Sequence, residues 1–199
     1  MRPSAHDEVE VKLRVADVAA MRRQLREIGA RKAGRVFERN VLFDSPDRAL
    51  QRSGKLLRIR WNNSRAVLTF KAPVPMSAAK QGYKVRREVE FSVASPDQFQ
   101  AVLAGLGFSA GFQYEKMRTT YRLTTARDLS IELDETPIGA FLELEGPPRQ
   151  IDRVARRLGY DPANYIVANY FALYRGYCQR RGRPIGHMLF PSRVRKNLR

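Results

Sequence analysis

The sequence predicts an α+β fold in which an eight-stranded antiparallel β-barrel carries helices packed on its outside. Eight segments alternate apolar and polar residues with the period of two that is typical of a strand. Most of these segments are joined by short turns, which favour antiparallel neighbours. Several other segments carry apolar residues at helical spacing and can cover one side of a sheet. Eight strands with alternating faces favour a closed barrel.

The elements follow in chain order from these patterns. The first strand is expected at 8–15, and Asp17 can cap a helix over 18–28 that Gly29 ends. The other strands are expected at 35–43, 55–61, 65–71, 83–91, 114–123, 129–135 and 139–145, with a hairpin turn at Asn62-Asn63-Ser64 and a loop over 72–82. The other helices are expected at 96–105, 148–158 and 163–178, and the aromatic residues of the last one are expected to pack onto the barrel.

Basic residues dominate the charge of this 199-residue chain, whose size suits one domain with at most an appendage. Lys and Arg number 37 against 20 Asp and Glu, and the resulting net charge of +17 points to an anionic partner. Residues 176–199 hold seven of the basic residues and no acidic one. We therefore expect one domain over 1–179 and a basic C-terminal extension over 180–199, for which nucleic acid is a possible but not favoured partner.

Several classes of protein are excluded by what the sequence lacks. No segment approaches the ~18–20 apolar residues of a membrane span, and Met1–Asp7 has no apolar signal-peptide core. Cys178 is the only cysteine, so neither an internal disulfide nor a cysteine-based zinc site can form. The two histidines, His6 and His187, lie near opposite ends of the chain. We expect a cytoplasmic location, and the sequence leaves the oligomeric state open.

Charged residues recur at i, i+2 on one face of seven of the expected strands, opposite an apolar face. The basic members are Lys12, Arg58, Arg60, Lys71, Lys84, Arg86, Lys116 and Arg118, and the acidic members are Glu8, Glu10, Glu88, Glu90, Glu132, Asp134, Glu143 and Glu145. A single strand of this kind usually exposes its charged face to solvent. Here the pattern recurs in seven strands, and helices are available to cover the apolar faces. This indicates instead that the charged faces line a tunnel inside the barrel. The pattern alone leaves both arrangements open.

A tunnel of this kind would suit a polyphosphate together with a divalent cation. Arg and Lys match phosphate oxygens, whereas carboxylates repel a naked polyphosphate unless they hold a metal ion beside it. The pairs Glu8/Glu10 and Glu143/Glu145 can aim two carboxylates at one ion, for which Mg²⁺ or Mn²⁺ is the natural candidate. Such a site would support phosphoryl transfer.

The same residues resemble the CYTH domain family, the triphosphate tunnel metalloenzymes. Glu8-Val9-Glu10-Val11-Lys12 matches the ExExK signature of that family. Six further segments match in order, namely Leu57-Arg58-Ile59-Arg60, Thr69-Phe70-Lys71, Arg87-Glu88-Val89-Glu90, Lys116-Met117-Arg118, Glu132-Leu133-Asp134 and Glu143-Leu144-Glu145. The resemblance covers roughly residues 5–175. It implies an eight-stranded tunnel and an enzyme such as a class IV adenylyl cyclase, a thiamine triphosphatase or an inorganic triphosphatase.

The resemblance also implies roles for individual residues. The metal ligands would be Glu8, Glu10, Glu143 and Glu145, assisted by Asp134. The triphosphate would be held by Lys12, Arg58, Arg60, Lys71, Lys116 and Arg118. Strand parity, meaning the alternation of side chains between the two faces of a strand, adds Lys84 and Arg86. Lys12, Lys71, Glu88 and Glu90 would take part in catalysis. Where the family often has Ser-Tyr or Ser-Lys in its last helix, this chain has Asn169-Tyr170, which leaves the tunnel-closing role of that position open.

Three functions remain in consideration. The favoured one is a metal-dependent triphosphatase acting on inorganic triphosphate or a small organic triphosphate. The second is a class IV adenylyl cyclase that converts ATP to cyclic AMP and pyrophosphate, for which the sequence shows no identifiable adenine pocket. The third is a polyphosphate- or RNA-binding module without turnover, which the intact carboxylate pairs argue against.

Overall fold

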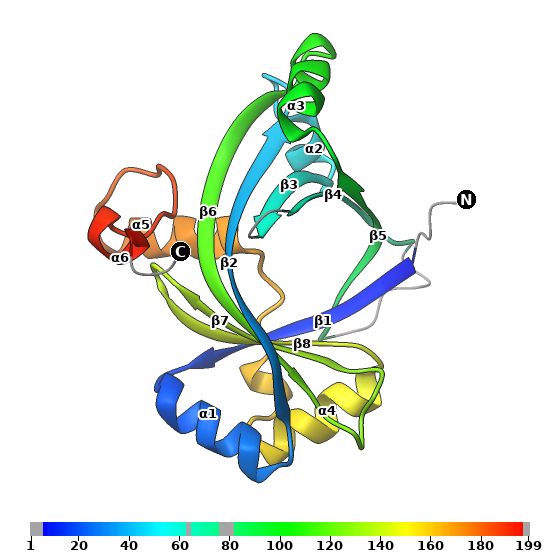
Figure 1. Cartoon of the computed structure of the whole chain (residues 1–199), viewed down its shortest axis with the longest axis vertical. Helices are drawn as coiled ribbons and strands as arrows, with labels where there is room; N and C mark the ends of the chain where they lie inside the picture. The colour runs from blue at the N-terminus through cyan, green and yellow to red at the C-terminus, as the bar shows by residue number, and fades with distance from the viewer. Residues whose placement is uncertain (1–5, 63–64, 76–81, 197–199) are drawn as a thin grey trace.

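The computed structural model describes residues 6–62, 65–75 and 82–196, and in this part of the chain eight strands close into an antiparallel barrel (Figure 1). The strands are β1 (His6–Val15), β2 (Arg31–Asp44), β3 (Leu56–Asn62), β4 (Arg65–Pro73), β5 (Lys84–Val93), β6 (Ser109–Arg122), β7 (Ser130–Thr136) and β8 (Gly139–Glu145). Their order around the barrel is β1-β5-β4-β3-β2-β6-β7-β8. The predicted fold class is therefore confirmed. Asn63 and Ser64 of the expected hairpin turn and residues 76–81 of the expected loop lie outside the described residues.

Two helices cover the outer face of β1, β7 and β8. They are α1 (Val18–Glu27), which the Asp17 carboxylate caps by accepting hydrogen bonds from the N–H groups of Ala19 and Ala20, and α4 (Pro148–Arg157). The apolar faces of these elements form one core, to which Val11, Leu13, Leu25, Leu133, Leu142 and Ile151 contribute fully buried side chains. Burial of these faces favours the arrangement with helices outside, which directs the charged faces of the same strands into the barrel.

A second core lies between the outer face of β2, β3 and β4 and α3 (Pro96–Gly105). Ile59 and Leu68 from the sheet pack there with Leu103 from the helix. The short helix α2 (Ala49–Arg52) follows β2. The expected helices over 18–28, 96–105 and 148–158 thus lie where the sequence places them, to within a residue.

The last helix is shorter than expected. The prediction of one helix over 163–178 is wrong, because a 3₁₀ turn (Pro162–Asn164) and an extended segment precede α5 (Tyr170–Arg180). In that extended segment the backbone of Ile166 exchanges two hydrogen bonds with the backbone of Lys12 on β1. The Asn169 side chain then caps α5 by accepting a hydrogen bond from the N–H of Ala172. Apolar periodicity indicates which side chains are buried. It does not indicate that the backbone of Ile166 pairs with β1 instead of forming a helix.

Strands β2 and β6 begin four and five residues earlier than expected, at Arg31 and Ser109. They pair along most of their length, with register shifts between Lys32 and Gly34 and between Val41 and Phe43. A register shift interrupts the alternation of the two faces, so the period of two does not extend to these strand ends.

The C-terminal residues fold back onto β6. Met188, 1% exposed, bridges to Tyr114, and Phe190 donates its N–H to the carboxylate of Glu115, which also pairs with Arg195 of α6 (Ser192–Lys196). Met188 belongs to a third core with Tyr114, Ile138, Phe141 and Tyr170. The boundary expected between residues 179 and 180 falls in the last turn of α5. Among the described residues no helix is both long and apolar enough to span a membrane.

The buried position of Met188 gives a first prediction. Met188→Ala is expected to lower the free energy of unfolding by about 2–5 kcal/mol, because it leaves a cavity between the C-terminal segment and the barrel. Val194→Ala, at a position that is 36% exposed in α6, is expected to cost less than about 0.5 kcal/mol. Urea unfolding measures both. Equal effects of the two substitutions would show that the C-terminal segment is not packed as described.

Candidate functional site

The interior of the barrel holds a charged cavity of about 240 Å³. Thirteen of the predicted site residues line it, namely Glu8, Glu10, Lys12, Arg58, Arg60, Lys71, Lys84, Glu88, Glu90, Lys116, Arg118, Glu143 and Glu145. They come from six strands, and they lie on the strand faces opposite the two cores that α1, α4 and α3 cover. The structure thus brings together residues that are up to 137 positions apart in the sequence.

Two predicted residues, Arg86 and Asp134, do not line this cavity. Arg86 lies near the start of β5 and donates a hydrogen bond from Nη1 to the backbone oxygen of Gly54 at 2.9 Å. Asp134 is 0% exposed and lies behind the cavity wall. Neither side chain reaches the space that the other predicted residues surround.

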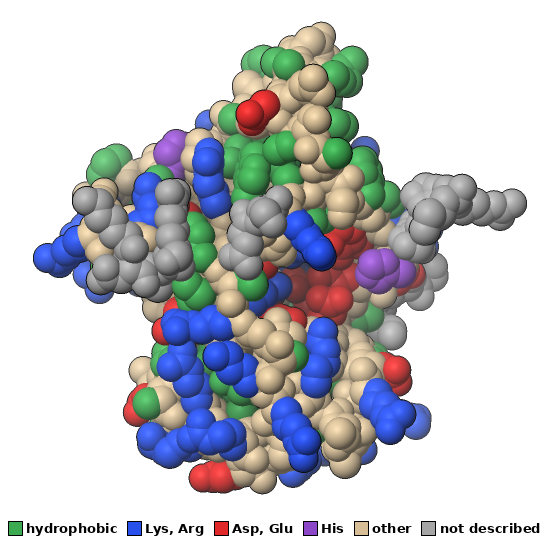
Figure 2. Space-filling model, in the orientation of Figure 1, with side chains coloured by type: hydrophobic (Ala, Val, Ile, Leu, Met, Phe, Trp, Pro, Cys, Tyr) green, Lys and Arg blue, Asp and Glu red, His purple; other side chains and the backbone are tan. Residues whose placement is uncertain are grey.

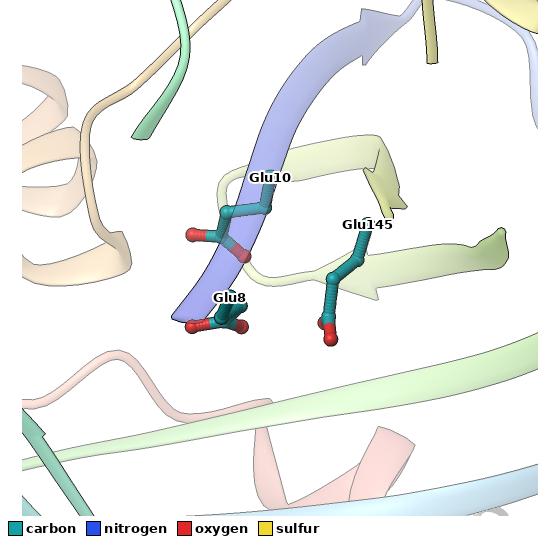
Figure 3. A group of neighbouring side chains, drawn as sticks. All are labelled: Glu8, Glu10 and Glu145. Carbon is teal, nitrogen blue, oxygen red and sulfur yellow. The ribbon is translucent and has the colours of Figure 1, made fainter. Parts of the chain in front are cut away.

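Three carboxylates from two adjacent strands converge at one side of the cavity (Figure 3). Glu8, Glu10 and Glu145 each offer an oxygen, and these oxygens lie within 4.8 Å of one another. The pairing of Glu10 with Glu145 across β1 and β8, with Glu8 two residues away on the same face, creates this triad. Hard oxygen donors in this number are the ligands that Mg²⁺ and Mn²⁺ prefer.

The electrostatics of this carboxylate triad fit a cation. Burial, and then the negative charges of Glu8 and Glu10, raise the pKa of Glu145 to about 8. Burial also opposes ionisation of Glu10, but the charges of Lys12 and Lys84 outweigh it and hold the pKa of Glu10 well below its usual range. A divalent cation would relieve the repulsion that Glu145 experiences, so the residues present fit the metal that the sequence predicts.

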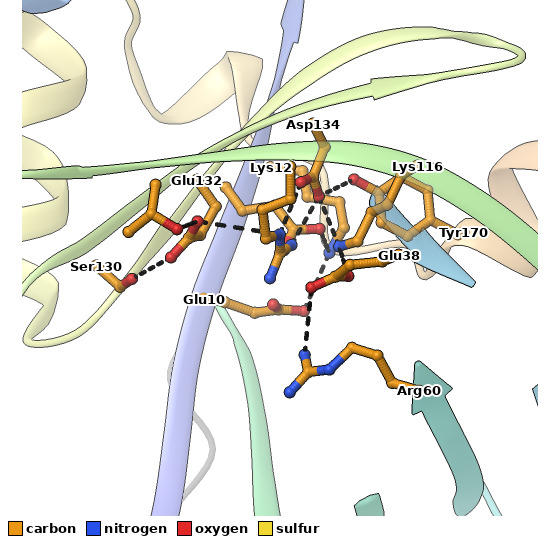
Figure 4. A network of polar contacts seen from close by, with 12 residues as sticks. Glu10, Lys12, Glu38, Arg60, Lys116, Ser130, Glu132, Asp134 and Tyr170 are labelled. Atoms are coloured by element: carbon orange, nitrogen blue, oxygen red, sulfur yellow. Dashed lines mark hydrogen bonds and ion pairs between the residues drawn. The ribbon is translucent and has the colours of Figure 1, made fainter. Parts of the chain in front are cut away.

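The other two predicted metal ligands are engaged in ion pairs (Figure 4). Asp134 accepts hydrogen bonds from Lys116 at 2.8 Å, from Arg118 at 2.7 Å and from the Tyr170 hydroxyl at 2.7 Å. Glu143 lies 3.3 Å from the Lys12 ammonium and 2.5 Å from the Arg118 guanidinium. This buried network joins β1, β6, β7, β8 and α5, and it fixes the positions of three of the predicted phosphate-binding cations.

Three of the four remaining cations of the tunnel, Arg60, Lys71 and Lys84, also face carboxylates. Lys71 pairs with Glu8 at 2.5 Å and with Glu88 at 3.1 Å, and Lys84 pairs with Glu10. Arg60 contacts Glu90 at 3.0 Å. These three charges are tolerated in the tunnel because each has a partner of opposite sign. A bound polyanion would offer these cations phosphate oxygens in place of carboxylate oxygens.

Sequence reasoning missed three polar residues of the tunnel. Glu38 on β2 is 3% exposed and lies 3.5 Å from Lys116 and 3.9 Å from Arg60. Tyr114 and Thr69 each contact the Arg58 guanidinium, at 3.0 and 3.1 Å. Of the three, only Glu38 could have been found from the sequence, because it is a charged residue on the inward face of its strand. It was missed because no second charged residue lies two positions away.

The pKa of Glu38 gives a pH-dependent prediction. Burial alone would raise this pKa, but the charges of Lys116, Arg118 and Arg60 outweigh burial and lower it to about 2. A depressed carboxyl pKa contributes stability above its unfolded value, and this contribution is lost as the pH falls from about 4.5 through 2. Glu38→Gln is therefore expected to be less stable than wild type by about 3 kcal/mol above pH 5, with the gap closing toward pH 2. Urea unfolding between pH 2 and 6 checks this, and a gap that stays constant with pH would contradict it.

The excess positive charge lies outside the tunnel. Figure 2 shows acidic side chains gathered in a hollow of the barrel and Lys and Arg side chains spread over the end of the molecule that carries α1 and α4. The cavity lining itself is nearly balanced, with seven basic and six acidic side chains among the described residues. Net charge is therefore a poor guide to the chemistry of this site.

The fold and the site define a β-tunnel protein in which buried Lys and Arg side chains surround a carboxylate triad. The chain belongs to the CYTH domain family, which matches residues 6–166. A protein of Methanocaldococcus jannaschii named "Putative adenylate cyclase" is 27% identical over 139 residues, which is 69% of this chain and 75% of that protein. The predicted family is confirmed.

Solved structures show the same fold. The PH1012 protein of Pyrococcus horikoshii is 27% identical with a TM-score of 0.66, and the match covers 82% of this chain and 96% of that one. A "putative adenylate cyclase" from Vibrio parahaemolyticus is 19% identical with a TM-score of 0.72 over 85% and 98% of the two chains. A Hippeastrum protein described as a "putative adenylyl cyclase" with a dominant triphosphatase activity is 21% identical with a TM-score of 0.63 over 89% and 97%.

Proposed function

We propose that this protein is a divalent-metal-dependent triphosphatase that hydrolyses a triphosphate inside the tunnel. The observation that carries the proposal is one cavity inside the barrel in which the carboxylate triad lies beside seven buried or half-buried cations. A site that only bound a polyanion would have no use for three converging carboxylates. The activity described for the Hippeastrum protein is consistent with this proposal.

The side chains divide the work as follows. Lys12, Arg58, Arg60, Lys116 and Arg118 bind the phosphate oxygens and stabilise the negative charge that develops on them during transfer. The Asp134 network holds Lys116 and Arg118 in place, so that little reorganisation is needed when substrate enters. A metal ion held by Glu8, Glu10 and Glu145 would neutralise phosphate charge and activate water.

Glu88 is assigned to the attacking water, and Glu90, which contacts Arg60 at 3.0 Å, to the positioning of that cation. Burial, followed by the charge of Glu8, raises the pKa of Glu88 against the opposing effect of Lys71. A carboxylate with a raised pKa is better suited to accept a proton at neutral pH. Lys71, between Glu8 and Glu88, positions that carboxylate beside the triad.

The alternative is a class IV adenylyl cyclase, and the names of the Methanocaldococcus and Vibrio relatives favour it. In that reaction the 3′-hydroxyl of ATP attacks the α-phosphorus and releases pyrophosphate. Product analysis with Mg²⁺ or Mn²⁺ separates the two reactions. A triphosphatase releases orthophosphate from inorganic triphosphate, ATP, GTP or thiamine triphosphate, whereas a cyclase converts ATP to cyclic AMP and pyrophosphate. Absence of both products would refute both enzyme assignments.

A further inference from the structure

A row of arginines lies on the outer surface of α4, which covers the barrel wall on the side away from the tunnel. Arg149, Arg153, Arg156 and Arg157 fall at i, i+4, i+7 and i+8, so they share one face of the helix. Within α4, which the structure describes completely, these four arginines are the only exposed residues, and Ile151 on the opposite face is fully buried. The surface that α4 presents to solvent is therefore basic from one end to the other.

Two hydrogen bonds join α4 to its neighbours. Arg157 donates from Nη2 to the backbone oxygen of Ile28, just after α1, at 3.1 Å, and Arg153 donates from Nη2 to the backbone oxygen of Thr125, in the loop 123–129, at 2.9 Å. The helix α1, this loop and α4 therefore lie side by side at one end of the molecule (Figure 1). A guanidinium has five N–H donors, so both arginines keep further donors for a ligand.

The neighbouring elements extend this positive surface. They contribute five more exposed cations, namely Arg23 and Arg26 on α1, Arg31 and Lys32 at the start of β2, and Arg127 in the loop. We call these five residues and the four arginines of α4 the basic face, and Figure 2 shows Lys and Arg side chains gathered at this end of the molecule. None of these nine described residues lines the tunnel cavity.

Few carboxylates offset the basic face. Among the described residues, Arg156 is the one member with a carboxylate within 4.0 Å, that of Asp152. The exposed acidic residues on α1, α4 and the loop are Glu27 and Asp128. At the opposite end of the molecule, residues 91–111, which include α3, hold a single charged residue. The excess positive charge is thus concentrated on one face, as in proteins that bind a polyanion, instead of being spread over the whole surface.

The side chains of the basic face decide which polyanion it fits. Helices that lie on a membrane present large apolar residues such as Trp, Phe or Leu. Proteins that bind single strands present aromatic residues on which bases stack. Among the described residues of α1, the loop and α4, no large hydrophobic residue is exposed. Arginine forms paired hydrogen bonds with phosphate oxygens, so the basic face favours the phosphate backbone of a duplex.

The arginine row on α4 has a length that fits the B form of DNA. From Arg149 to Arg157 it extends roughly 12 Å, at ~1.5 Å per residue. The major groove of B-form DNA is about 12 Å wide, so the two ends of the row can contact phosphates on both strands that border the groove. The major groove of A-form RNA is deep and narrow, so a row of this length does not match its edges.

We infer that this protein binds duplex DNA through the basic face, by contacts between its guanidinium groups and the phosphate backbone. Contacts with phosphate carry no sequence information and release counterions from the duplex. Binding is therefore expected to be independent of the DNA sequence and to weaken steeply as the salt concentration rises. The basic face lies outside the tunnel, so this inference goes beyond the proposed function and is tested separately from it.

The test removes three cations of the basic face together. Arg23→Gln, Arg127→Gln and Arg149→Gln take one exposed cation each from α1, the loop and α4. Fluorescence anisotropy with a labelled DNA duplex of about 20 base pairs measures the affinity between about 50 and 200 mM salt. The wild type is expected to bind with a Kd on the order of 10⁻⁶–10⁻⁴ M at physiological salt. The triple variant is expected to bind at least ~10-fold more weakly at the lowest salt, with a slope of log K against log salt that is smaller by roughly 2–3, because each phosphate contact contributes about 0.9 to that slope.

The matched control removes the same charge from the C-terminal extension. Arg180→Gln, Arg183→Gln and Arg193→Gln are exposed positions there, and together they are expected to lower the affinity for DNA less than about threefold, because only long-range attraction is lost. Both triple variants are expected to keep the urea midpoint of unfolding and the rate of triphosphate hydrolysis of the wild type. These two measurements show that the fold and the tunnel are intact.

Several results would overturn the inference. One is a wild type that does not bind the duplex at the lowest salt, and another is an equal loss of affinity in the control variant. Single-stranded DNA or duplex RNA of the same sequence that binds as tightly as duplex DNA would also overturn it. Vesicles that contain phosphatidylserine are the last probe, because a basic-face variant that loses vesicle binding and retains DNA binding would identify a membrane surface instead. Absence of triphosphate hydrolysis in the wild type would refute the proposed function and leave DNA binding unaffected.

Discussion

Replacing Glu8 and Glu10 together by glutamine is expected to reduce metal-dependent turnover at least ~100-fold. Substitution of residues that merely support metal ligands typically costs 10–100-fold in metal affinity or activity, and this change removes two of the three carboxylates that converge. Glutamine keeps the volume of both side chains, so the tunnel retains its shape. Lys84 loses the carboxylate that it faces and Lys71 keeps only Glu88, so both can contact phosphate more readily. The affinity for triphosphate without metal is therefore expected to stay the same or to rise.

The measurements are phosphate release over a range of Mg²⁺ and Mn²⁺ concentrations and calorimetric binding of triphosphate in the presence of EDTA. Glu27→Gln, at an exposed position at the end of α1, is the matched control and is expected to change neither quantity. Full turnover in the double variant would refute the assignment of the carboxylate triad. A wild type that binds triphosphate without turnover in any metal, and whose affinity the double variant preserves, would support a non-catalytic binding module.

Strand parity carried most of the prediction of the site. The alternation of Glu8, Glu10 and Lys12 with valines places those three side chains on one face, and the apolar cores around α1 and α4 show why that face turns inward. Parity does not say how far along the tunnel a residue lies. Arg86 has inward parity, yet its guanidinium reaches the Gly54 carbonyl at the end of the barrel.

Parity also does not say which opposite charges meet. Asp134 and Glu145 have equivalent patterns in the sequence, but Asp134 lies beside Lys116 and Arg118 of the neighbouring β6, whereas Glu145 lies beside Glu10. These neighbours follow from the barrel closure, which no local pattern contains. The packing of the C-terminal segment on β6 could not be predicted either, because it also depends on contacts between distant parts of the chain. Its anchors are single side chains such as Met188 within a basic stretch, and Glu115, which receives Arg195, lies on the face of β6 opposite the tunnel.

Asp134→Leu is expected to lower the free energy of unfolding by about 3–5 kcal/mol, even in the absence of metal. Asp134 is 0% exposed and Lys116 is fully buried beside it, so removal of the carboxylate leaves a buried ammonium whose one remaining ion pair among the described residues is the 3.5 Å contact with Glu38. The Tyr170 hydroxyl also loses its acceptor. Asp128→Leu, at an exposed position in the loop before β7, is the matched control and is expected to cost less than about 0.5 kcal/mol.

The double variant Asp134→Leu with Lys116→Met sharpens the test. Replacing both members of a buried ion pair by apolar residues is often close to neutral, so the double variant is expected to recover part of the stability that the single variant loses. If Asp134 instead served chiefly as a metal ligand, Asp134→Leu would change the metal-free stability little and would abolish the stabilisation that Mg²⁺ gives the wild type. Urea unfolding with EDTA and with Mg²⁺ distinguishes the two roles. Loss of an ion-pair partner lowers the free energy of unfolding in EDTA, whereas loss of a metal ligand lowers the increase in that free energy that Mg²⁺ produces.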